Sequence, residues 1–334
     1  MRHERSGSTL AGSWRALRRR IITPNASAAS PEVRGFHRKN ADAQELLETI
    51  GRTFLAGYGY AVEARTPAEA EKELEEVPTR FRGFAYEGAA MGLAVLDGLS
   101  PGRGGRFARF LEGRGRDHVY MAYVGAGWAM ARLPRLRWSR LGPFDPLLQW
   151  LVLDGYGFHQ AYFRTRRYVH EQYRPARFPW PAGGPEWYAL RAIDQGIGRA
   201  MWFVGGADAG LVATMIDGFP ESRRADLYSG AGLAATYAGG AGEEELAEFL
   251  RRAGTHRPQV AQACAFAAEA RVRAGLVVPH TRVATEVFCG MTPERAAQVS
   301  RDVRPDGSSS PGEPPAYELW RQRVADQFLS AGRC

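Results

Sequence analysis

HVYMAYVGAGWAMA, residues 118–131, places Gly125 and Gly127 one residue apart inside an otherwise apolar, helix-like run. The same arrangement recurs at four other places in the chain: Gly57/Gly59, Gly155/Gly157, Gly196/Gly198 and Gly230/Gly232. Gly230 follows Gly125 by 105 residues, which is three steps of 35. At the same offset the segment 215–218 aligns with 110–113. The chain is therefore built from repeated units of about 35 residues.

A repeat of this length is typical of stacked helical hairpins, each of which completes its core against its neighbours. No run of alternating β-branched residues between hairpin turns predicts a strand. Glycine inside a helix costs about 1 kcal/mol relative to alanine, so the glycine pairs need a compensating gain. Close approach of helix backbones supplies it through dense dispersion contacts. We therefore predict an all-α, α-solenoid-like fold of stacked helical hairpins with Gly/Ala-rich helix interfaces.

The composition is that of a globular protein and gives no sign of nucleic-acid binding. The chain has 334 residues, of which 45% are hydrophobic and 24% charged. Its net charge is +8, but Lys39 and Lys72 are the only lysines, so the positive charge is almost entirely arginine. No basic stripe interleaved with aromatic residues follows the short arginine cluster near the N-terminus. We expect no nucleic-acid partner.

Cysteine usage and hydropathy indicate a cytoplasmic protein. The three cysteines form no CxxC pair, which favours reduced thiols over a disulfide framework. The N-terminal segment lacks an apolar core of signal-peptide length. The longest uncharged run, residues 227–242, is too short for a bilayer, which needs about 20 apolar residues. We therefore expect a chain that does not span a membrane.

Turn-forming residues divide the chain. Residues 1–32 are predicted to be a flexible basic tail, 33–303 the helical repeat domain, 304–316 a Pro/Ser loop and 317–334 a C-terminal helix packed on the same domain. Thr66-Pro67 and Thr292-Pro293 have the hydroxyl cap and first-turn proline of a helix start. Clustered Pro and Gly predict breaks at 137–146 and 174–185. The second break is interpreted as a rigid connector or, alternatively, as a docking loop.

Alignment of the repeats reveals two columns of residues on one helix face. The residue before each glycine pair, or before the small residue at the equivalent position, reads Glu87, Val124, Asp154, Gln195, Ser229, Cys264. Four residues later the column reads Met91, Trp128, Phe158, Arg199, Leu233, Ala268. Carboxylates, an amide, a hydroxyl and large aromatics on one face are typical of a groove for a long apolar ligand with a few polar anchors. The alternative is that the polar groups hydrogen-bond between adjacent helices and set their register.

His159 stands in a further column that otherwise holds mainly small residues, and Asp154 and Tyr156 lie near it in sequence. An imidazole there could be a general base near neutral pH, or a buried packing residue. The candidate catalytic residues are Glu87, Asp154 and His159. The candidate substrate-binding residues are Met91, Trp128, Tyr156, Phe158, Gln195, Arg199 and Ser229.

No metal site is expected, and the need for a cofactor stays open. The sequence contains no HExxH, no paired Glu-x-x-His and no Gly-x-Ser-x-Gly motif. Residues 230–235 match the dinucleotide pattern GxGxxA, but the segment before them is charged and does not predict the strand that this motif requires.

Several longer strings carry a family resemblance: RGFH at 34–37, FRGFAYEGAAMG at 81–92, residues 118–131 quoted above, LDGYGFHQAYF at 153–163, DQGIGRA at 194–200 and DLYSGAG at 226–232. Together they resemble the uncharacterised protein family (domain of unknown function 1702) that is carried in enediyne antibiotic gene clusters beside the iterative polyketide synthase. The resemblance runs from about residue 33 to about residue 328.

The resemblance implies participation in converting the linear polyene made by the synthase into the enediyne core, together with other proteins of the shared gene set. It supplies no catalytic residues, so the candidates above rest on the repeat alignment alone. Two hypotheses follow. The protein binds the long conjugated chain along the column face and transfers protons, or it is a helical-repeat adaptor that holds the synthase and partner proteins together without doing chemistry.

Overall fold

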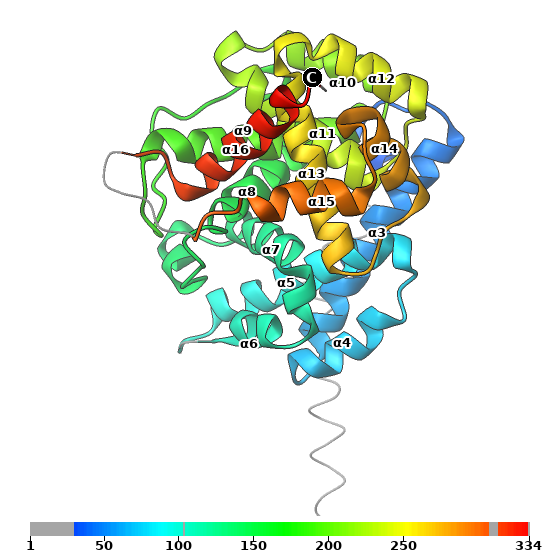
Figure 1. Ribbon diagram of the computed structural model, residues 1–334. Coiled ribbons are helices and arrows are strands. Elements are labelled where there is room, and N and C mark those ends of the chain that lie inside the picture. The colour runs from blue at the N-terminus through cyan, green and yellow to red at the C-terminus, as the bar shows by residue number, and fades with distance from the viewer. Residues whose placement is uncertain (1–29, 103, 307–312, 333–334) are drawn as a thin grey trace, which may run out of the picture.

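The computed structural model describes residues 30–102, 104–306 and 313–332, and over these residues the chain is helical with no β-strand (Figure 1). The predicted all-α fold is confirmed. Seven long helices form the body: α3 Ala41–Glu63, α5 Thr79–Leu99, α7 Val119–Arg132, α8 Trp150–Phe163, α9 Glu186–Val204, α11 Glu221–Ala238 and α13 Arg257–Arg273. The other α-helices lie before, between or after them: α2 Pro31–Arg34, α4 Pro67–Glu75, α6 Arg106–Glu112, α10 Ala209–Asp217, α12 Glu243–Arg252, α14 Pro279–Cys289, α15 Pro293–Asp302 and α16 Ala316–Ser330. The 3₁₀ turns are η2 Arg114–His118, η3 Arg135–Arg140 and η5 Gly254–His256, and η4 Arg166–His170 is a short π-helix.

The two helix starts predicted from Thr-Pro pairs are confirmed. The Thr66 hydroxyl accepts a hydrogen bond from the Glu69 backbone N–H at 3.3 Å and caps α4. The Thr292 hydroxyl caps α15 in the same way, 3.4 Å from the Arg295 nitrogen. In each helix proline occupies the first turn, where its missing N–H has no helical partner to lose.

The glycine pairs of α7, α8, α9 and α11 join each of these helices to the long helix before it and the long helix after it. In α7, a Cβ on Gly125 would lie 3.0 Å from the Met91 nitrogen of α5, and one on Gly127 would lie 2.7 Å from the Tyr156 nitrogen of α8. Because the two glycines are about 200° apart around the helix, they serve opposite neighbours. Gly155 faces α7 and Gly157 faces α9 by the same rule, and the pairs in α9 and α11 continue the series.

The observed packing differs in detail from the stacked hairpins expected from the sequence, because the long helices pack mainly on one another. The densest contacts join successive long helices, in the order α3, α5, α7, α8, α9, α11 and α13. The short helices make fewer contacts with the long helices next to them in sequence. In the middle of the array the 3₁₀ turn η3 and the π-turn η4 stand where a complete outer helix would be expected.

The array curls so that its last long helix returns to its beginning. Helix α13 contacts α7, and the buried Arg271 of α13 donates to the Arg80 carbonyl oxygen of α5 at 3.1 Å. Tyr237 at the end of α11 meets Phe84 of α5 edge to face, with ring centroids 5.2 Å apart. The long helices therefore surround an interior instead of forming a flat stack.

The first and last segments cover the open sides of this interior. Before α3, the Lys39 ammonium group reaches across to the Gly240 carbonyl oxygen at 2.8 Å, near the end of α11. At the other end of the chain α16 packs on α13, as Figure 1 shows. Two ion pairs of 2.8 Å, Arg321 with Asp226 and Arg191 with Glu318, hold α16 to α11 and α9.

The two predicted breaks pack on each other. Phe178 of the second break is buried and stacks on Trp138 at a centroid distance of 5.5 Å, and Trp180 stacks on Phe144 at 6.3 Å. These contacts agree with the rigid connector interpretation. Of the predicted tail, residues 1–29 lie outside the described residues, as do 307–312 of the Pro/Ser loop.

Candidate functional site

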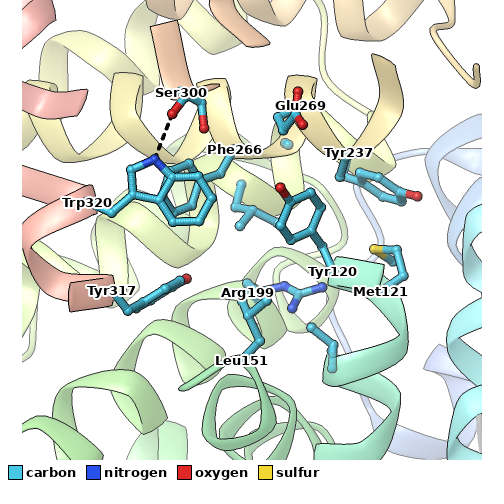
Figure 2. A pocket seen from close by; sticks show the side chains of 14 residues that line it. Tyr120, Met121, Leu151, Arg199, Tyr237, Phe266, Glu269, Ser300, Tyr317 and Trp320 are labelled. Carbon is cyan, nitrogen blue, oxygen red and sulfur yellow. Dashed lines mark hydrogen bonds between the residues drawn. The ribbon is translucent and has the colours of Figure 1, made fainter. Parts of the chain in front are cut away.

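Two apolar cavities lie among the long helices. The first, the tyrosine cavity, is lined by α7, α8, α9, α11, α13, α15 and α16. Figure 2 shows the aromatic side chains around it, with the guanidinium group of Arg199 pointing in from α9. Its main aromatic residues are Tyr120, Tyr237, Phe266, Tyr317 and Trp320.

The second, the histidine cavity, is lined by α3, α5, α7, α8 and α9. Its volume is about 50 Å³, compared with about 30 Å³ for the tyrosine cavity. Its defining residues are Phe54, Glu87, Met91, Trp128, Phe158 and His159. The repeat alignment named five of these six as candidates.

A layer of three buried charged residues, Glu87, Asp154 and Arg199, lies where the two cavities approach each other. Glu87 lines the histidine cavity and Arg199 lines the tyrosine cavity, while Asp154 forms a short ion pair with Arg199. Arg199 also lies over the Phe158 ring, 5.3 Å from its centroid. Glu87 Oε1, Asp154 Oδ2 and Arg199 Nε have no hydrogen-bond partner among the described residues. Buried polar atoms are normally satisfied, so this polar layer has capacity to bind a ligand or water.

Within this layer, the carboxyl group of Glu87 can change its protonation state near neutral pH. Burial, with a smaller contribution from the neighbouring Asp154 carboxylate, raises the pKa of its carboxyl group to about 7. The Arg199 guanidinium and the Trp128 indole act in the opposite direction. A carboxyl group with this pKa can give or take a proton near neutral pH.

Asp154 and Arg199 form a buried ion pair. Burial raises the pKa of Asp154 above its usual value, and the Arg199 guanidinium opposes that effect. Burial alone would lower the pKa of Arg199, but the Asp154 and Glu87 carboxyl groups outweigh it and raise that pKa. Arg199 therefore keeps its positive charge, and Asp154 serves as its counter-ion.

His159 faces the histidine cavity among aromatic rings. Its ring centroid is 5.5 Å from that of Trp128 and 4.6 Å from that of Phe163. Burial, together with the charges of three arginines, lowers the pKa of His159 to about 3. The imidazole is neutral at physiological pH, so it can exchange hydrogen bonds with a ligand but is a weak base.

The remaining candidates divide between the cavities and the helix interfaces. Gln195 donates to the Tyr317 hydroxyl at 3.5 Å beside the tyrosine cavity. Ser229 donates to the Gln262 amide oxygen of α13 at 3.2 Å, which is the register-setting role weighed as the alternative. Tyr156 turns away from both cavities and packs against Trp138 and Phe178.

The acid near His159 is not the one that is nearest in sequence. The described structure pairs Asp154 with Arg199, and it is Glu87 that shares the cavity with His159. Residues five apart on a helix point about 140° apart, which separates Asp154 from His159.

The repeat alignment reached the tyrosine cavity at Val124, Arg199 and Leu233 but missed its aromatic lining. Met121 and Leu151 line this cavity and lie one helical turn before Val124 and Asp154, the first-column residues of α7 and α8. Their spacing places them on the same helix faces as the column, so the sequence pattern could have identified them. Tyr317 and Trp320 come from α16, outside the repeats, and no local pattern places them beside α7.

Within residues 30–102, 104–306 and 313–332, no group of three or more His, Cys, Asp or Glu side chains is arranged to hold a metal ion. Among the helices of the same residues, none is long and apolar enough to cross a membrane.

The sequence matches the model of the family described as "Protein of unknown function (DUF1702)" over residues 13–328. The chain belongs to the DUF1702 family. The match covers both cavities and the polar layer of this DUF1702 protein. No curated protein and no solved structure matches the chain.

Proposed function

We propose that this protein participates in enediyne core biosynthesis in the cytoplasm by binding the linear polyene made by the iterative polyketide synthase. The observation that carries the proposal is an aromatic cavity with a buried acid, Glu87, in its lining. The ligand class comes from the strings that resemble proteins of enediyne gene clusters. The histidine cavity supplies a suitable place for the chain, because flat conjugated chains stack on aromatic rings such as Trp128 and Phe158.

The cavity is narrow, so binding of a long chain requires side chains to move. Met91 is suited to this role because its unbranched thioether side chain adapts its shape at low cost. The helix backbones are in close contact at the glycines, so they separate less readily than a side chain such as Met91 changes its conformation. We therefore expect the chain to enter by displacing side chains along the inner face of α5 and α7, with the helices staying in place.

Glu87 is the residue best placed for chemistry. With its pKa near 7, it can protonate a chain atom that reaches the polar layer and recover the proton from water. The Arg199–Asp154 pair next to it provides a fixed field that stabilises charge developing on the chain. His159, neutral at this pH, orients the ligand by hydrogen bonding.

The adaptor hypothesis is less well supported. An adaptor needs its aromatic face to be open to partner proteins, whereas Trp128 and Phe158 are buried around a cavity.

The direct test deletes the gene in a producing strain and restores it as wild type, Glu87→Gln or Tyr156→Phe. We expect the wild type and Tyr156→Phe, which lies outside the cavities, to restore the enediyne core. Glu87→Gln should accumulate the polyene while the protein remains folded. Restoration of full production by Glu87→Gln would remove the catalytic role, and full production by the deletion strain would remove the proposed function.

Binding is measured separately by titrating the purified protein with a conjugated C15 polyene. Fluorescence of Trp128 should be quenched, and Trp128→Phe should lose that component of the quenching. The variant is needed because the chain contains eight tryptophans. Equal quenching of both proteins would contradict binding in the histidine cavity.

A further inference from the structure

A shallow hollow lies on the surface next to the histidine cavity. This arginine hollow has a volume of about 450 Å³ and lies between α2 and the segment that joins α8 to η4. Four arginines line it, Arg34, Arg164, Arg166 and Arg167, together with a single acid, Glu171. Arg164, Arg166 and Arg167 are exposed to solvent.

The arginine hollow adjoins the histidine cavity through Phe163. This ring lines both sites, and the Arg34 guanidinium lies over it at 4.3 Å and donates to the Phe163 carbonyl oxygen at 3.4 Å. Arg132, which is exposed, lies at the edge of the histidine cavity. The charges of Arg34, Arg132 and Arg164 reach His159 and contribute to lowering its pKa. The cationic surface and the apolar cavity are therefore neighbouring parts of one region.

The charge in the hollow is not neutralised by its own acid. Glu171 forms an ion pair with Arg166 at 2.9 Å, and it is the one acid beside the four arginines in the lining of the hollow. Arg167 is held in place by stacking over the Tyr173 ring at 3.8 Å. Arginines gathered in a concave site are the usual means of binding phosphate, because the planar guanidinium pairs with two phosphate oxygens at once.

An arginine-lined hollow beside an apolar cavity fits a ligand with a phosphate at one end and an apolar chain at the other. We propose that the arginine hollow binds the phosphate of a phosphopantetheine arm whose thioester-linked chain occupies the histidine cavity. The position of the chain rests on the proposed function, whereas the position of the phosphate rests on the arginines. The protein would then receive its substrate while the chain is still attached to its carrier arm.

The experiment compares two ligands with the same C16 polyunsaturated chain, acyl-phosphopantetheine and acyl-pantetheine, which differ only in the phosphate. Dissociation constants are measured by fluorescence titration of the full chain. We expect the phosphate to tighten binding at least tenfold at low salt, and the advantage to shrink as salt is raised. Equal affinities would overturn the proposal. If acyl-pantetheine itself fails to bind, it is the assignment of the apolar chain, and thus the proposed function, that fails.

Variants locate the phosphate. The double variant Arg164→Ala/Arg167→Ala should lose most of the phosphate advantage and keep its affinity for acyl-pantetheine, and the corresponding double lysine variant should recover part of it. Arg323→Ala, an exposed arginine on α16, is the matched control and should behave as wild type. An unchanged phosphate advantage in the double alanine variant would show that the phosphate binds elsewhere and would overturn the assignment.

A final comparison distinguishes the two sources of a phosphopantetheine arm. The same acyl group is presented on a carrier protein and as a coenzyme A thioester. Tighter binding of the carrier form assigns the hollow to a protein-bound arm, and equal or tighter binding of the coenzyme A form assigns it to the free cofactor. Both results support phosphate recognition, whereas failure of both forms to outcompete acyl-pantetheine contradicts it.

Discussion

Glu87 links protonation to the stability of the fold. Because burial raises its pKa from 4.5 to about 7, the folded protein holds this proton more tightly than the unfolded chain does. Its contribution to stability is complete below about pH 4.5 and is lost as the pH rises through about 7. The full shift corresponds to about 3 kcal/mol.

Glu87→Gln should therefore gain stability relative to the wild type as the pH rises from about 5 to 8. Urea unfolding at several pH values gives the difference in free energy of unfolding, with Glu73→Gln on the exposed face of α4 as control. A difference that stays constant with pH would show that the pKa of Glu87 is not raised.

Asp154 is the counter-ion of a fully buried arginine. Asp154→Asn removes the ion-pair partner of Arg199 in the interior and leaves Glu87 as the nearby acid, which should lower the free energy of unfolding by about 3 to 5 kcal/mol. Glu32→Gln, which breaks the exposed pair with Arg38, should cost less than about 1 kcal/mol. Similar losses in both variants, measured by urea unfolding, would contradict the structural role of Asp154.

At the scale of the helix, the glycines differ in how closely their neighbours approach. A Cβ on Gly155 would lie 2.8 Å from the Val124 carbonyl carbon, and this backbone atom of α7 cannot move without shifting the helix. A Cβ on Gly232 would lie 3.0 Å from Cγ1 of Val260, a side chain that can shift.

Gly155→Ala should destabilise the protein by about 2 kcal/mol or more through overpacking. Gly232→Ala should stay within about 1 kcal/mol of the wild type, because the helix propensity gained by alanine offsets the closer contact. Thermal unfolding compares the two variants, and equal melting temperatures would contradict the explanation by backbone approach.

Features encoded within one repeat could be predicted from the sequence. The glycine pairs predicted helices in close contact, and the Thr-Pro pairs predicted where two helices begin. The alignment also selected Glu87, Met91 and Trp128, which line one cavity, because residues four apart share a helix face. Tyr156 was selected by proximity in sequence, although two residues along a helix point about 200° apart.

Features that join distant repeats could not be predicted. The tyrosine cavity depends on how far the array curls, which is the sum of small rotations between helices that no single repeat encodes. The same holds for Tyr317 and Trp320, whose helix lies outside the repeats. The ion pair between Asp154 and Arg199 could not be predicted for a related reason. Arg199 belongs to the next repeat and lies one helical turn after Gln195, the residue equivalent to Asp154.

At the scale of the whole molecule, Arg271 closes the curl. It is fully buried and has no carboxylate partner in the described part of the chain; it donates instead to the carbonyl oxygens of Arg80, Leu276 and Tyr237. Its guanidinium also lies 4.1 Å from the centroid of the Tyr237 ring. One side chain thus ties α13 to α5 and α11.

Arg271→Leu should leave these carbonyl oxygens unsatisfied and lower stability by about 2 kcal/mol. Amide hydrogen exchange should rise most at the start of α5 and the end of α11, and least in α8. Arg323→Leu on the exposed side of α16 is the control. A uniform rise across all helices would show that Arg271 does not act at this closure.

The alternation of glycine contacts restricts where the chain can change in length during evolution. One residue inserted between Gly155 and Gly157 would rotate the second glycine by about 100° and place a side chain against α9. Insertions in the connections, such as 174–185, leave every glycine facing its neighbour. Relatives should therefore differ in length in the connections between the long helices and scarcely at all within those helices. An alanine inserted after Tyr156 should prevent folding, whereas a glycine-serine pair inserted near Gly183 should not.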